Sequence, residues 1–154
     1  GVIVDGEEGC AVKFAKCCNP LPGEEIIGFI TKGYGISIHK ADCPNISNAY
    51  ANEENVNRFV KAEWNMPSGS SSSTYESAIQ IFVTNRISIL ADISVALADM
   101  RVDIVSINTQ NLEGASIINM VISCKDINHF NSIVSRVRNI KDVIRVTRVV
   151  GAST

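Results

Sequence analysis

The first half of the chain is decided by residues 12–45, which read VKFAKCCNPLPGEEIIGFITKGYGISIHKADCPN. Four residues in this stretch are typical zinc ligands: Cys17, Cys18, His39 and Cys43. Thiolate sulfur and imidazole nitrogen suit a tetrahedral Zn²⁺ ion. The adjacent cysteines are unusual, because side chains of neighbouring residues on a flat strand point to opposite faces. A shared site therefore needs a turn, and Asn, Pro and Gly at residues 19–23 are typical turn residues.

The second pair of candidate ligands follows an alternating segment. Ile36 and Ile38 are expected to face a core, so Ser37 and His39 lie on the opposite face. A tight loop or one helical turn can bring His39 close to Cys43, with Asp42 as a local cap or as the acceptor of the imidazole N–H. The spacing alone leaves open a second interpretation, in which these are reduced thiols and a surface histidine without a metal.

Residues 13–45 resemble the cysteine-rich module near the C-terminus of long RelA/SpoT-type stringent-response enzymes, the guanosine tetra/pentaphosphate synthetase/hydrolases. The resemblance rests on the run CCNPLPG and on the later run GYGISIHKADC. It implies a zinc-finger or ribosome-intersubunit module whose structural Zn²⁺ is bound by Cys17, Cys18, His39 and Cys43. One residue departs from the pattern, since Tyr34 stands where many relatives have a basic side chain.

The composition is that of an ordinary globular protein, with 154 residues, 45% of them hydrophobic and 19% charged. No apolar run approaches the roughly 20 residues of a membrane span, and no signal peptide opens the chain. We therefore expect a cytoplasmic protein with no membrane partner. Because the chain begins with Gly1, we expect a fragment. Five cysteines do not suggest a disulfide framework, and Cys10 and Cys124 are expected to be packing residues.

A polar run at residues 67–74, PSGSSSST, predicts a linker between a module at 1–66 and a domain at 75–154. The first part carries six Lys and Arg against nine Asp and Glu, a net charge of -3, and the rest carries eight against seven, or +1. Neither part is strongly basic. Any contact with RNA is therefore expected to be local.

The predicted elements indicate an α+β chain. Before the linker, a small mixed α/β module is expected from strands at 2–4, 12–14, 25–30, 36–39 and 58–64 and a helix at 44–52. After it, strands are expected at 76–84, 102–110, 116–123 and 143–150, with a turn at 111–114. A helix at 87–100 would bury Leu90, Ile93, Leu97 and Met100. A second helix, capped by Asp126, would leave His129 facing solvent. Its buried residues would be Ile127, Phe130, Ile133, Val134 and Val137. This βαββαβ order predicts a ferredoxin-like fold, with a four-stranded antiparallel sheet covered on one side by both helices.

The second half also resembles an ACT domain, through the run NRISILADI at residues 85–93. Ser88 stands at the place of the usual glycine, and we expect Asn85 to cap the helix. The resemblance implies an amino-acid site, for example for a branched-chain amino acid, and an ACT-mediated homodimer. The implied ligand residues are Asn85, Arg86, Ile87, Ser88, Ile89 and Leu90.

The glycine-rich loop at residues 31–35 has two interpretations. It is either a simple hairpin turn, or part of an RNA site in which lysines approach phosphates and Tyr34 stacks on a base. The lysines of this site would be Lys13, Lys16, Lys32 and Lys40.

Together the two resemblances imply that the chain is a noncatalytic regulatory fragment of a bifunctional (p)ppGpp synthetase/hydrolase, a GTP pyrophosphokinase. It would sense the ribosome and tRNA and signal to the N-terminal catalytic region of the same protein. The alternative is an ACT sensor that binds amino acids without ribosome contact. A zinc enzyme or redox protein would need an open coordination position or a reactive pair at Cys17 and Cys18, and no general base in an HExxH motif accompanies them.

Overall fold

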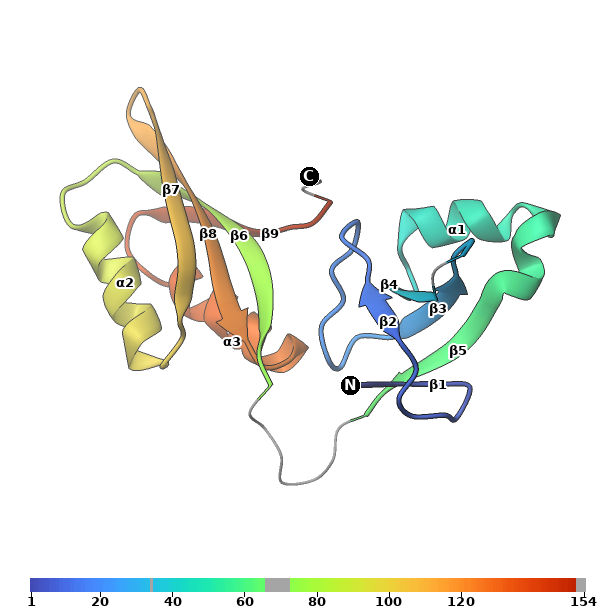
Figure 1. Ribbon diagram of the computed structural model, residues 1–154. Coiled ribbons are helices and arrows are strands. Elements are labelled where there is room, and N and C mark those ends of the chain that lie inside the picture. Colours follow the sequence, from blue (N-terminus) through green and yellow to red (C-terminus); the bar gives the residue numbers. More distant parts are fainter. Residues whose placement is uncertain (34, 66–72, 152–154) are drawn as a thin grey trace. The chain divides into compact units, whose positions relative to one another are not determined.

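The computed structural model describes residues 1–33, 35–65 and 73–151, which Figure 1 traces in colour. The chain divides into two compact units, Gly1–Ser71 with Val150–Thr154 and Ser72–Val149. Most of the segment 67–74, predicted to be a linker, lies outside the described residues. Among the described residues, no helix is long and apolar enough to cross a membrane.

The first unit is built on a five-stranded sheet of order β1-β5-β3-β4-β2. Its strands are β1 (Val2–Val4), β2 (Val12–Phe14), β3 (Ile26–Ile30), β4 (Ile36–Lys40) and β5 (Phe59–Trp64), and they are joined by helix α1 (Pro44–Tyr50) and the 3₁₀ helix η1 (Glu53–Arg58). The β2–β4 pair is parallel, with Phe14 opposite Ile38. Parallel neighbours end at the same edge of a sheet, so the segments that follow β2 and β4 begin side by side.

The core of the first unit lies on both faces of β4. Ile38 is fully buried against Val2, Val4 and Ala62, whereas Cys18, Cys43 and Ile46 form a second buried cluster. This arrangement confirms that Ile38 and the candidate ligands face opposite ways. The central strands pack closely at Gly28, because a Cβ there would lie 2.7 Å from a methyl carbon of Val60.

The second unit has the predicted βαββαβ order, and the fold class is confirmed. Its elements are β6 (Tyr75–Thr84), α2 (Ile89–Asp99), β7 (Ile104–Leu112), β8 (Ala115–Cys124), α3 (Ile127–Arg138) and β9 (Val143–Val149). The antiparallel sheet has the order β7-β8-β6-β9. Residues of β6 and β8 alternate between buried and half-buried, which is the pattern of a sheet with one covered face. Gly114 adopts a φ of 75° in the turn between β7 and β8.

The beginning of α2 differs from the expectation. Ser88 adopts a left-handed φ of 83°, so the helix begins at Ile89 rather than at residue 87. Asn85 is not the cap: its amide donates to the Leu112 carbonyl oxygen, and its side-chain oxygen accepts from the Ser116 hydroxyl. The buried face of α2 is formed by Ile89, Ile93, Ala96 and Leu97, whereas Leu90 is 40% exposed.

The beginning of α3 agrees with the prediction. The Asp126 side chain accepts a hydrogen bond from the His129 backbone N–H at 2.7 Å, which confirms it as the N-cap. His129 is half-buried rather than solvent-facing, and its Nδ1 accepts a hydrogen bond from the Lys125 backbone N–H.

Candidate metal centre

Two turns at one edge of the first sheet bring the four candidate ligands together. Cys17 and Cys18 lie in a turn after β2 that is closed by a hydrogen bond from the Asn19 N–H to the Ala15 carbonyl oxygen. Asn19 is left-handed, with φ 43°. This turn begins before the predicted one at residues 19–23. Cys43 is held after β4 by donation of its own N–H to the Lys40 carbonyl oxygen at 3.0 Å.

The four donor atoms lie close enough to share one metal ion, since all of them lie within 4.8 Å of one another. The Cys17 sulfur lies 3.6 Å from the Cys43 sulfur, 4.0 Å from the Cys18 sulfur and 3.4 Å from the His39 Nδ1 atom. The Cys18 sulfur lies 3.8 Å from the same nitrogen. Zinc bond lengths require tetrahedral edges of about 3.8 Å between sulfurs and about 3.6 Å between sulfur and nitrogen. The spacing and the chemistry of this donor set therefore suit Zn²⁺.

Hydrogen bonds from neighbouring groups orient His39 and stabilise the thiolate form of Cys18. The Ser37 hydroxyl lies 3.1 Å from Nε2 of His39, which leaves Nδ1 directed at the sulfurs. Asp42 was expected either to take this place or to act as a local cap, but its side chain is 80% exposed and pairs with Lys40, and Cys43 is the N-cap of α1. The Lys40 backbone N–H donates to the Cys18 sulfur at 3.2 Å, an interaction that stabilises a thiolate.

Burial governs the protonation of the metal-free cluster. Burial, together with the neighbouring Cys17 and Cys43 side chains, raises the pKa of Cys18 to about 12, although the hydrogen bond from the Lys40 N–H acts in the opposite direction. Burial also raises the pKa of Cys43, but the backbone N–H groups of Asn45 and Ile46 and the Cys17 thiol bond to its sulfur and lower the pKa overall. Burial lowers the pKa of His39, which favours the neutral form that binds metals. A bound divalent ion would displace the Cys18 proton.

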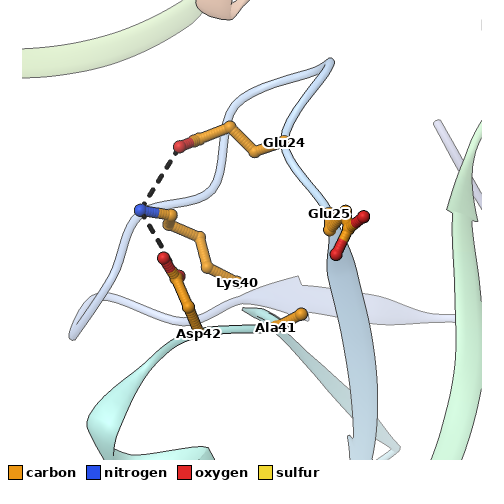
Figure 2. A pocket seen from close by; sticks show the side chains of 5 residues that line it. All are labelled: Glu24, Glu25, Lys40, Ala41 and Asp42. Carbon is orange, nitrogen blue, oxygen red and sulfur yellow. Dashed lines mark ion pairs between the residues drawn. The ribbon is translucent and has the colours of Figure 1, made fainter.

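The structure separates one of the predicted RNA-binding lysines from the others. Lys13 and Lys16 line one groove together with Phe14, Ala15, Thr31, Ile36 and Ser37. Lys32 belongs to the turn between β3 and β4, in which the Thr31 N–H donates to the Gly35 carbonyl oxygen. Lys40 lies at the opposite end of β4 and pairs with Glu24 at 3.3 Å and Asp42 at 3.6 Å (Figure 2). Tyr34 lies outside the described residues.

The predicted amino-acid loop forms an open depression in the second unit, lined by Asn85, Arg86, Ile87 and Asn111. Arg86 is engaged there: its Nε and Nη1 atoms each lie 2.8 Å from a carboxylate oxygen, of Asp142 and Asp92 respectively. Of the other predicted ligand residues, Ile89 is buried in the core and Leu90 is partly exposed on α2. Asp92 belongs to the run at residues 85–93, but its pairing with Arg86 was not predicted. Asp142 was missed, since only the folded chain places residue 142 beside residue 86.

Comparison with known families assigns both units. Residues 2–65 match the RelA/SpoT RIS domain, and residues 71–148 match the ACT domain. A probable GTP pyrophosphokinase of Mycobacterium leprae is 38% identical over 99% of this chain, which corresponds to 19% of the relative. The bifunctional (p)ppGpp synthase/hydrolase RelA of Mycobacterium tuberculosis is 36% identical over 99% of this chain and 20% of the relative. The GTP pyrophosphokinase of Escherichia coli K12 is 29% identical over 98% of the chain and 20% of its own length.

The chain thus spans about a fifth of the length of these curated relatives. Among solved structures, the crystal structure of the ACT domain from GTP pyrophosphokinase of Chlorobium tepidum is 17% identical. It covers 50% of this chain and 100% of its own, with a TM-score of 0.46.

Proposed function

Because this chain belongs to the RelA/SpoT family, as a RIS domain followed by an ACT domain, we propose that it is a noncatalytic regulatory part of a GTP pyrophosphokinase that makes and hydrolyses (p)ppGpp. The observation that carries the proposal is the unbroken similarity to such enzymes across both domains. The chain would sense the ribosome and its tRNA in the cytoplasm and transmit that state to the catalytic region of the same protein.

We further propose that the ribosome is contacted locally, through the groove that contains Lys13 and Lys16 and through the adjacent turn with Lys32. Tyr34 is the proposed stacking residue of that turn. Lys40 was included in the predicted RNA site, but its charge is shared with two carboxylates, so it has less to offer a phosphate. In the same proposal Zn²⁺, held by the three cysteines and His39, supplies a structural cross-link that fixes the surface presented to RNA.

Cosedimentation with ribosomes, with and without deacylated tRNA, tests this function. The variant Lys13→Glu/Lys16→Glu should bind more weakly, and its affinity should depend less on salt by roughly one unit of log–log slope for each lost phosphate contact. Lys61→Glu is the matched control, because Lys61 is an exposed lysine of the same unit that pairs with Glu63. Equal binding of the parent chain and the double variant to ribosomes would contradict the proposed RNA site. Failure of the parent to cosediment would remove the ribosome contact altogether.

The open depression at Asn85, Arg86, Ile87 and Asn111 favours a second candidate, an ACT sensor for amino acids. Titration with leucine, isoleucine and valine should then shift the amide signals of residues 85–88 and 111 in NMR spectra. Alanine-sized and acidic amino acids serve as comparison ligands. Unchanged spectra at millimolar concentrations would exclude this candidate.

A further inference from the structure

Glu24 joins the two segments that carry the candidate metal ligands. One carboxylate oxygen accepts the Leu21 backbone N–H at 2.9 Å, and the other pairs with the Lys40 ammonium at 3.3 Å. The Glu24 side chain is only 11% exposed, and Leu21 is fully buried. Figure 2 shows Glu24 on one side of Lys40 and Asp42 on the other. A carboxylate that is nearly buried and bonded to a backbone amide and an ammonium fixes both partners more firmly than an exposed pair does.

The backbone of Lys40 stands at the centre of the ligand set. Its N–H donates to the Cys18 sulfur, and its carbonyl oxygen accepts the Cys43 N–H. His39 is its immediate neighbour in the chain. The position of residue 40 therefore sets the positions of three of the four ligands: Cys18, which follows β2, and His39 and Cys43 at the end of β4.

The main chain of Glu24 is itself anchored to the sheet. The Trp64 indole N–H donates to the Glu24 carbonyl oxygen at 2.9 Å, and the Trp64 ring stacks on Phe14 with centroids 5.5 Å apart. The next residue, Glu25, accepts the Ala41 N–H at 2.8 Å. A continuous series of contacts thus runs from the end of β5 through Glu24 to Lys40 and on to the cysteines.

From these contacts we infer that Glu24 is a positioning residue of the metal centre: it fixes Lys40, and through Lys40 the spacing of Cys18 and Cys43. This inference rests on the proposed zinc site. Loss of the Glu24 charge would leave every ligand in place but less well preorganised, so the metal would bind more weakly and leave faster. The other carboxylate beside Lys40 belongs to Asp42 and is 80% exposed, so it contributes little.

The test uses the full chain loaded with Co²⁺, whose visible absorption reports tetrahedral thiolate coordination, and with Zn²⁺. Glu24→Gln keeps an oxygen for the Leu21 N–H but removes the charge. It should bind both metals about 10- to 100-fold more weakly and lose Zn²⁺ faster to a chelator, with the Co²⁺ bands retained. Asp42→Asn and Glu63→Gln should match the parent, since Glu63 belongs to an exposed pair on β5.

A second variant separates positioning from general destabilisation. Lys40→Met removes the same ion pair from the other side and keeps the backbone N–H that bonds to Cys18. The double variant Glu24→Gln/Lys40→Met should therefore bind metal no more weakly than Lys40→Met alone. The inference would be overturned if the losses of metal affinity in the two single variants added up in the double variant. It would also be overturned if Glu24→Gln kept the parental affinity and release rate, or if it lowered the melting temperature without changing the affinity. A parent chain that forms no Co²⁺–thiolate bands would remove the metal centre and the role of Glu24 together, whatever the ribosome assay shows.

Discussion

At the scale of single residues, Cys43 offers the clearest test of the metal centre. Cys43→Ser should reduce the zinc content from about one ion per chain to a small fraction, because a neutral hydroxyl is a poor zinc ligand. Elemental analysis under reducing conditions measures this. Cys10→Ser is the control, since Cys10 lies outside the four-residue cluster. A chain with no zinc, whose melting temperature does not change with a chelator, would contradict the site.

Ser88 is one of five non-glycine residues with a positive φ in the described part of the chain. At a φ of 83° a side chain clashes with its own backbone, which costs about 1–2 kcal/mol. Ser88→Gly should therefore stabilise the second unit by about 1 kcal/mol, after allowance for the more flexible unfolded chain. Ser135→Gly on the exposed face of α3 is the control and should destabilise by about 0.5 kcal/mol. Chemical denaturation followed by circular dichroism measures the change in unfolding free energy for each variant. Changes of opposite sign would support the strain at Ser88, and destabilisation by both variants would contradict it.

At the scale of elements, the contact between β3 and β5 is sensitive to a single methyl group. A Cβ at residue 28 would lie 2.7 Å from a Val60 methyl carbon and 3.0 Å from an Ile36 methyl carbon. Gly28→Ala should destabilise the first unit by about 1–3 kcal/mol through overpacking. Ser47→Ala on the exposed side of α1 should have a small effect. An unchanged denaturation midpoint for Gly28→Ala would mean that β3 and β5 separate easily.

The elements also show what sequence reasoning can reach. Apolar periodicity predicted the βαββαβ order and the strands of the first unit, because buried faces leave a regular pattern along the chain. The residue types predicted Cys17, Cys18, His39 and Cys43, which the structure brings together. The supporting residues were not predicted: Ser37 replaced Asp42 beside His39, and Glu24 was missed. Their roles depend on contacts between segments distant in sequence. The left-handed Ser88 was also missed, because backbone strain leaves no periodic signal.

At the scale of the whole molecule, we predict that the two units respond separately to loss of metal. Trp64 is the single tryptophan and lies in the first unit, so its fluorescence reports that unit alone. A chelator should lower the denaturation midpoint seen by Trp64 and leave the second unit unaffected. An isolated fragment of residues 75–154 should fold alone and give dispersed NMR amide signals. A collapsed amide spectrum, or a common shift of both transitions, would contradict this independence.

The parallel pairing of β2 with β4 has a consequence for the order in which the first unit assembles. A metal that bridges Cys17 and Cys43, 26 residues apart, closes a loop. It lowers the conformational entropy of the unfolded chain, which corresponds to about 3.5 kcal/mol of free energy. During synthesis both cysteines exist before β5, the strand that lies between β1 and β3. Metal binding can therefore stabilise the pairing of β2, β3 and β4 before β5, the strand that pairs with β1, has been synthesised. In a chain that ends at Asn52, amides of β3 and β4 should be protected from hydrogen exchange only when zinc is supplied, and those of β1 should exchange freely in either case.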